Sequence, residues 1–149
     1  MAAMILTAAL AVSAAPHKQV PFKGALQGRD ADSNPTDTTV VVTTTGTGIG
    51  TLLGQFSFIQ VTTVDFTNGT DAGTATWIAA NGDKIFTTIA GSGEQVGDLI
   101  SITEINTITG GTGRFSGAQG SFTVERLASP TTFMTSGSFH GAVSSPGAH

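Results

Sequence analysis

The residues with the most promising chemistry lie in Leu99–Thr109, where apolar and polar residues alternate. One face of this segment carries three isoleucines together with Glu104 and Asn106, because successive residues of a β-strand point to opposite sides. If the isoleucine face is buried, the Glu104 carboxyl must be paired, or desolvation must raise its pKa. A carboxyl with a raised pKa can act as an acid or a base. Glu104 and Asn106 are therefore the candidate catalytic residues, and Glu104→Gln is expected to stabilise the fold at neutral pH.

A structural interpretation of Glu104 stays open beside the catalytic one. The carboxyl can lie near the mouth of a barrel or form an ion pair with Arg126 or Arg114, and it then needs no raised pKa. The candidate ligand-binding residues are Gln27, Gln60 and Trp77. As the single tryptophan, Trp77 can line a ligand cavity, plug the core or contact a second subunit.

Other kinds of site are excluded or disfavoured by the residue types. The chain has no cysteine, which excludes disulfides, thiolate zinc sites and a cysteine nucleophile. Its three histidines, His17, His140 and His149, show no spacing that suits a metal, and no Gly-x-Ser-x-Gly motif is present. The glycines of Gly111–Gly117 lack the spacing of nucleotide-binding loops and indicate a tight hairpin with positive φ. We expect neither a metal nor a cofactor.

Composition limits the fold and the partners. The 149 residues allow one compact domain, and 20 glycines and 25 threonines argue against a helical bundle. Six basic residues stand against ten acidic ones, and no basic run occurs. Nucleic-acid binding is not expected, because it needs a basic patch that neutralises phosphates.

The elements that must position the candidate site are short strands. Turn signals include Asn68-Gly69 and Asn81-Gly82, and the second predicts a two-residue hairpin. Gly28–Pro35 is expected to be a polar loop, and Gly46–Gly50 is expected to interrupt a strand. Short connections require antiparallel neighbours, and closing the sheet removes its exposed edges. We predict an all-β, calycin-like closed antiparallel barrel of about eight strands, with a β-sandwich as the alternative. The expected strands are Val20–Gln27, Thr38–Thr45, Leu52–Phe66, Thr74–Ala80, Lys84–Ala90, Leu99–Thr109, Ser121–Leu127 and Thr132–Val143.

The N-terminus has the pattern of an export signal. Met4–Val12 is apolar and is followed by Ser13, Ala14 and Ala15. We therefore expect a signal peptide over residues 1–15, one barrel domain over residues 16–149, and a secreted or periplasmic location. The alternative is an ordinary N-terminal strand or helix. No membrane anchor is expected, because no apolar run approaches the ~20 residues that span a bilayer.

One glycine-rich block resembles a known family. Ile108–Gly120 is similar to the hairpin shared by plant allene oxide cyclases and dirigent proteins, which are eight-stranded antiparallel barrels. Gly28–Asp30, Gly46–Gly50 and Phe133–Gly141 show a looser similarity. The resemblance implies an exported, bacterial-type member of the allene oxide cyclase barrel-like group, and it suggests a homotrimer.

The family's catalytic residues are not all present in this chain. The positions of the glutamate and the asparagine in the first strand of the cyclases correspond to Ala25 and Gln27 here. The cyclases also use a cysteine and a tyrosine, and this chain contains neither residue type. Three functions follow as hypotheses. The preferred one is an exported barrel of unassigned role that binds a small apolar or amphipathic molecule in its lumen. The alternatives are a cyclase or isomerase that uses Glu104 and Asn106, and a non-catalytic structural trimer. An open lumen with convergent polar groups favours the enzyme, and a filled lumen favours the structural protein.

Overall fold

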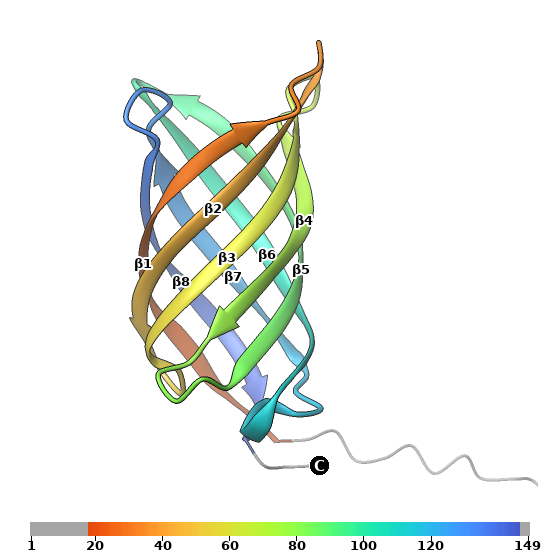
Figure 1. Ribbon diagram of the computed structural model, residues 1–149, viewed down its shortest axis with the longest axis vertical. Coiled ribbons are helices and arrows are strands. Elements are labelled where there is room, and N and C mark those ends of the chain that lie inside the picture. The colour runs from red at the N-terminus through yellow and green to blue at the C-terminus, as the bar shows by residue number, and fades with distance from the viewer. Residues whose placement is uncertain (1–17, 147–149) are drawn as a thin grey trace, which may run out of the picture.

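The computed structural model describes residues 18–146, which form a closed antiparallel barrel of eight strands (Figure 1). Each strand pairs with the next along the chain, and the first strand pairs with the last. The expected export signal, His17 and His149 lie outside the described residues. The strands are β1 (Gln19–Ser33), β2 (Thr39–Gly50), β3 (Gly54–Asp65), β4 (Thr70–Ile78), β5 (Lys84–Val96), β6 (Leu99–Gly111), β7 (Gly120–Ala128) and β8 (Met134–Ser144).

The prediction of a closed eight-stranded barrel is confirmed, but β1, β2 and β5 are clearly longer than expected, and β5 continues past Ala90 to Val96. β1 runs through most of the expected loop and ends at Ser33, and β2 continues through Gly46–Gly50 without interruption. In β2, the glycines at positions 46, 48 and 50 occupy alternate residues, so all three face the lumen. The sequence pattern predicts an interruption at Gly46–Gly50, because glycine weakens the interior of a strand.

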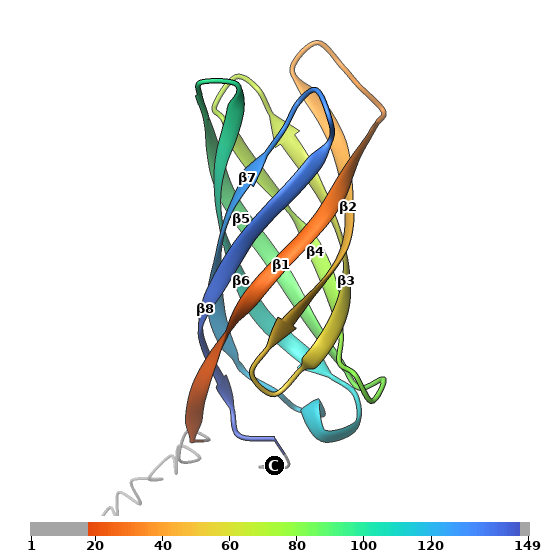
Figure 2. The same cartoon turned by 90° about the vertical axis from the view of Figure 1, so that its left-hand side faces the viewer.

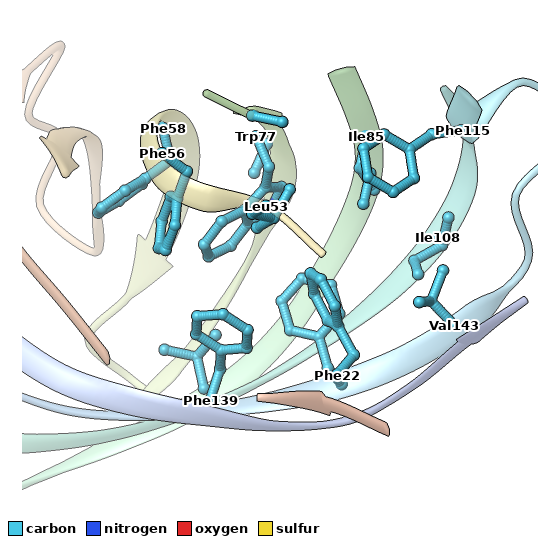
Figure 3. Packing of buried hydrophobic residues seen from close by; sticks show 14 of the residues in the cluster. Phe22, Leu53, Phe56, Phe58, Trp77, Ile85, Ile108, Phe115, Phe139 and Val143 are labelled. Atoms are coloured by element: carbon cyan, nitrogen blue, oxygen red, sulfur yellow. The ribbon is translucent and has the colours of Figure 1, made fainter. Parts of the chain in front are cut away.

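These glycines make room for an aromatic cluster that fills one part of the barrel. A Cβ atom at Gly48 would lie 2.5 Å from Phe56 Cζ, and one at Gly46 would lie 2.7 Å from Phe58 Cε1. The Trp77 ring stacks on Phe58, with ring centroids 5.2 Å apart. In Figure 3, Phe22 and Phe139 lie across the lumen from Trp77, Phe56 and Phe58. This part of the lumen is therefore a packed core.

The β4–β5 hairpin is confirmed, although its connection is longer than the expected two residues. The Ala79 N–H donates to the Asp83 carbonyl at 2.8 Å, and the Ala80 N–H donates to the Leu53 carbonyl at 2.9 Å. Gly82 has φ +91°, which fits the positive φ expected of the Asn-Gly pair. The hydrogen bond to Leu53 ties this turn to the β2–β3 connection.

The two ends of the barrel differ (Figures 1 and 2). The closed end carries the starts of β1 and β5, the β2–β3 turn and the 3₁₀ helix η1 (Gly113–Phe115), with Leu53 and Phe115 buried beneath. The open end carries the β1–β2, β3–β4, β5–β6 and β7–β8 connections, drawn at the top of Figure 1. Over residues 18–146 no helix has the length and hydropathy needed to cross a bilayer.

Candidate functional site

A cavity of about 690 Å³ occupies the lumen at the open end. Its side walls are mostly aliphatic, and aromatic side chains stand at its rim. Because strands alternate, every second residue of the strands that form this end faces the cavity. The wall and rim residues are Val40, Val42, Val64, Ile100, Ile102, Phe66 and Phe133. The lumen is therefore open above and filled below, and the boundary between the two parts is polar.

The centre of this polar layer is an ion pair between Glu104 on β6 and Arg126 on β7. Arg126 Nε donates to Glu104 Oε1 at 2.8 Å, and Nη2 donates to Oε2 at 3.4 Å. Their side chains are only 0% and 4% exposed, respectively. Gln60 Nε2 adds a hydrogen bond to Glu104 Oε2 at 3.2 Å. A buried carboxylate with this many donors is held as an anion.

Arg126 also contacts groups on the two strands that follow β7 around the barrel, β8 and β1. Its Nη1 donates to Thr135 Oγ1 at 3.1 Å and lies 3.6 Å from Asp30 Oδ1. That Asp30 oxygen accepts a hydrogen bond from Thr44 Oγ1 at 2.6 Å. One guanidinium therefore connects strands β1, β6, β7 and β8 at the floor of the cavity.

The structure lowers the pKa of Glu104, so the expected raised pKa is wrong. Burial alone would raise the pKa, but a hydrogen bond with Asp71, the charge and hydrogen bonds of Arg126 and the hydrogen bond from Gln60 together outweigh it. Of the two interpretations open for Glu104, the structure supports pairing with Arg126. The raised pKa was expected because the face pattern shows burial and does not show which partners other strands supply.

Asp71 on β4 is the carboxyl whose pKa is raised. Burial raises it from 3.8 to about 8, helped by a hydrogen bond with Glu104 and by the charge of Glu104, while Arg126 acts in the opposite direction. The two carboxyls come together above Gly91, where a Cβ would lie 2.6 Å from Asp71 Oδ1 and 2.7 Å from Glu104 Cγ. At neutral pH Asp71 is therefore protonated and Glu104 is ionised.

Apart from the hydrogen bond between the Asp71 and Glu104 carboxyls, two polar atoms at the cavity floor have no hydrogen-bond partner. They are Asp71 Oδ1 and Thr62 Oγ1. Asp71 is 8% exposed and Thr62 is 1% exposed, and both residues line the cavity. Buried polar atoms in native proteins are nearly always paired, so such atoms facing a cavity mark a place for a ligand or water.

Of the other predicted site residues, Gln60 lies at the floor of the cavity and the remaining three lie outside it. Asn106 and Trp77 are buried below the floor, where Thr87 Oγ1 donates to Asn106 Oδ1 at 2.8 Å and accepts from Trp77 Nε1 at 3.4 Å. Gln60 belongs to the floor through its bond to Glu104. Gln27, a candidate ligand-binding residue, does not face this cavity, because the pleat of β1 turns Leu26 inward and leaves Gln27 exposed on the outer face.

Sequence reasoning missed Asp71, Thr62 and Asp30 as site residues. A signal for Asp71 was available, since it shares its strand face with Ala75 and Trp77 in the same alternation that identified Glu104. Asp30 falls in the expected loop Gly28–Pro35, where no strand alternation assigns its side chain to the lumen. Over residues 18–146 no group of His, Cys, Asp and Glu could hold a metal ion.

Comparison with known proteins adds evidence on the fold. No protein-family model and no curated sequence matches the chain. The chain is similar to the solved structure of a pterocarpan synthase dirigent protein, with a TM-score of 0.57 and 14% sequence identity. The similarity covers 91% of this chain and 98% of the dirigent protein. The chain thus has the fold of a dirigent-like, closed eight-stranded antiparallel β-barrel.

Proposed function

We propose that this protein binds a small amphipathic molecule in the open end of its lumen. The observation that carries the proposal is the pair of unpartnered polar atoms, on Asp71 and Thr62, at the floor of an apolar-walled cavity. Such a site buries the apolar body of a ligand against aliphatic side chains and orients its polar group at the floor. The volume of about 690 Å³ lies within the range of small-molecule sites, roughly 300–1,000 Å³.

The proposal can be tested with a neutral, environment-sensitive naphthalene dye such as prodan. We expect the dye to bind and its emission to shift to the blue, because the cavity walls exclude water. Val42→Trp fills the cavity and should weaken binding at least tenfold, whereas Val41→Trp, on the opposite face of β2, should bind as the parent does. Ile102→Phe is a second filling variant on another wall. Equal binding by the lumenal and outer-face variants, or no binding by the parent, would contradict the proposal.

A second candidate function is acid–base catalysis of the cyclase or isomerase type. The observation that favours it is Asp71, which holds a proton at neutral pH while facing the cavity beside the Arg126 cation. Asp71, rather than Glu104 or Asn106, would then donate the proton to a bound unsaturated carbonyl or hydroxyl compound. The test is deuterium incorporation, measured by mass spectrometry, into a compound retained from the host and incubated with the protein in D₂O. Incorporation should be lost in Asp71→Asn; its persistence in that variant would remove Asp71 from the reaction.

A further inference from the structure

The charges of the barrel are separated along its axis. Of the described charged residues, nine of the ten acidic side chains lie in the half toward the open end, with only Arg29 and Arg126 as basic side chains there. The closed end has the reverse balance, with Asp83 against four basic side chains. The acidic residues of the open half are Asp30, Asp32, Asp37, Asp65, Asp71, Glu94, Asp98, Glu104 and Glu125. The basic residues of the closed half are Lys18, Lys23, Lys84 and Arg114.

The cavity itself has the same imbalance. Five acidic residues line it, at the floor and at the rim, and Arg126 is its one basic lining residue among residues 18–146. Arg126 is already paired with Glu104 at 2.8 Å and with Asp30 at 3.6 Å. Its charge is therefore balanced within the floor. Because Asp71 is protonated at neutral pH, the net negative charge of the rest of the cavity comes from Asp32, Asp65 and Glu94. The acidic lining residues are Asp30, Asp32, Asp65, Asp71 and Glu94.

The two unpartnered atoms at the floor favour the same kind of ligand group as the negative charge of the cavity does. Asp71 Oδ1 is a carboxyl oxygen and can only accept a hydrogen bond unless it carries the proton. Thr62 Oγ1 can accept as well as donate. A ligand group with several N–H donors would satisfy both atoms, whereas a carboxylate end would face acidic side chains and find no free cation.

From these observations we propose that the lumen takes an amphipathic organic cation, with its apolar body against the aliphatic walls and a protonated amine at Asp71 and Thr62. The inference rests on the proposed binding function and names the chemical class of its ligand. An organic cation fits better than a metal ion, because the described residues hold no metal-binding group and the walls above the floor are apolar.

Binding of a cation should release a proton from the protein. Asp71 has its pKa raised to about 8 by burial and by Glu104, and a nearby ammonium favours the ionised carboxylate. The amine's affinity should therefore rise as the pH increases toward 8, while the ligand remains protonated. The charged groups that face Asp71 or line the same cavity are Glu104, Arg126, Asp30, Asp32, Asp65 and Glu94.

The experiment compares three ligands with one apolar body: 2-naphthylmethylamine, 2-naphthylmethanol and 2-naphthoate. Calorimetry at pH 7.5 and low salt should show the amine binding about tenfold or more tightly than the alcohol, with no binding of the carboxylate. Titrations in two buffers of different ionisation enthalpy should show proton release with the amine alone. Equal or tighter binding of the alcohol or the carboxylate would overturn the inference and leave the binding function intact. Failure of all three ligands and of prodan would instead refute the binding function.

Variants identify the residues responsible. Asp71→Asn should reduce the preference for amine over alcohol about tenfold and abolish proton release, while the alcohol still binds. Glu125→Gln removes one acidic charge from the exposed face of β7 and should leave both ligands unaffected. If Asp71→Asn does not fold, Thr62→Val tests the second floor atom and should weaken the amine selectively. If Asp71→Asn, or Thr62→Val in its place, folds and still prefers the amine over the alcohol as strongly as the parent does, the proposed position of the amine at Asp71 and Thr62 is overturned.

Discussion

Glu104→Gln removes the anion that lies 2.8 Å from the buried Arg126 guanidinium. Glutamine has nearly the same shape, so the change tests charge and hydrogen bonding without creating a large cavity. Its amide nitrogen would face donors from Arg126 or Gln60, because both residues donate to Glu104 in the native structure. We therefore expect destabilisation, the reverse of what the strand pattern alone predicts.

The expected cost follows from the burial of the pair. Removing one partner of a buried ion pair costs about 3–5 kcal/mol. Arg126 keeps Asp30 at 3.6 Å and Thr135 at 3.1 Å, and Asp71 ionises more readily once the Glu104 charge is gone. These partners place the cost near the lower limit, about 3 kcal/mol, which lowers Tm by about 6–12 °C for a domain of this size.

The measurement is equilibrium unfolding in urea, followed by the fluorescence of Trp77 in the aromatic cluster. The deficit should be full at pH 7 and should shrink as the pH falls below about 4, where the lowered pKa of Glu104 no longer favours the native state. Glu125→Gln is the matched control and should change stability by less than about 0.5 kcal/mol. If Glu104→Gln is as stable as the parent at pH 7, the ion pair is not the element that holds the cavity floor.

Three further perturbations test other parts of the structure. Asp71→Asn should be as stable as the parent near pH 4 and increasingly more stable than the parent up to pH 8. The reason is that the raised pKa of Asp71 makes its ionisation destabilising, and urea unfolding across this pH range measures the effect. Gly48→Ala should cost about 1–3 kcal/mol or more in the same assay, since the added Cβ meets the Ala25 carbonyl oxygen of β1 as well as the Phe56 ring. Gly113→Val should also cost about 1–3 kcal/mol, because position 113 has φ +59° and faces the Asp83 carboxyl. Since this hairpin is structural and does not bind phosphate, added nucleotides should not change the Tm of the parent.

Each of these variants has a control. Asp65→Asn removes an acid at the rim of the cavity and should lack the pH-dependent gain of the Asp71 variant. Thr47→Ala lies on the outer face beside Gly48, and Thr107→Val lies on the outer face of β6; both should change stability by less than about 0.5 kcal/mol. If a control changes stability as much as its test variant does, the explanation given for that variant is contradicted. A nucleotide-dependent rise in the Tm of the parent would contradict the structural role of the hairpin that contains Gly113.

The barrel was predictable because its signals are local. Alternation, β-branched runs and turn signals together located the eight strands, and alternation placed Glu104 and Asn106 inside. The turn signals at Gly69 and Gly82 coincide with positive φ angles. The glycines of β2 were misinterpreted because their function depends on aromatic rings from other strands. A single strand cannot show which groups face it across the lumen.

The same reason explains the errors at the site. The partners of Glu104 come from Gln60, Asp71 and Arg126 on three other strands, and only the register of the closed sheet brings them together. Arg126 and Arg114 stay open as partners of Glu104 at the level of sequence, because the strand pattern does not show which arginine faces Glu104 across the lumen. Export and a homotrimer stay predictions.

The pairing of β1 with β8 has a consequence for how the chain folds. Its register runs from Gln19↔Ser144 to Arg29↔Met134, and it joins strands from opposite ends of the described chain. Every other ladder connects strands adjacent in sequence and can form locally, as hairpins do. This last ladder must close the longest loop, so it becomes available only after the final strand has left the ribosome. Until then, β1 presents an open edge that a chaperone can cover or that another nascent chain can pair with.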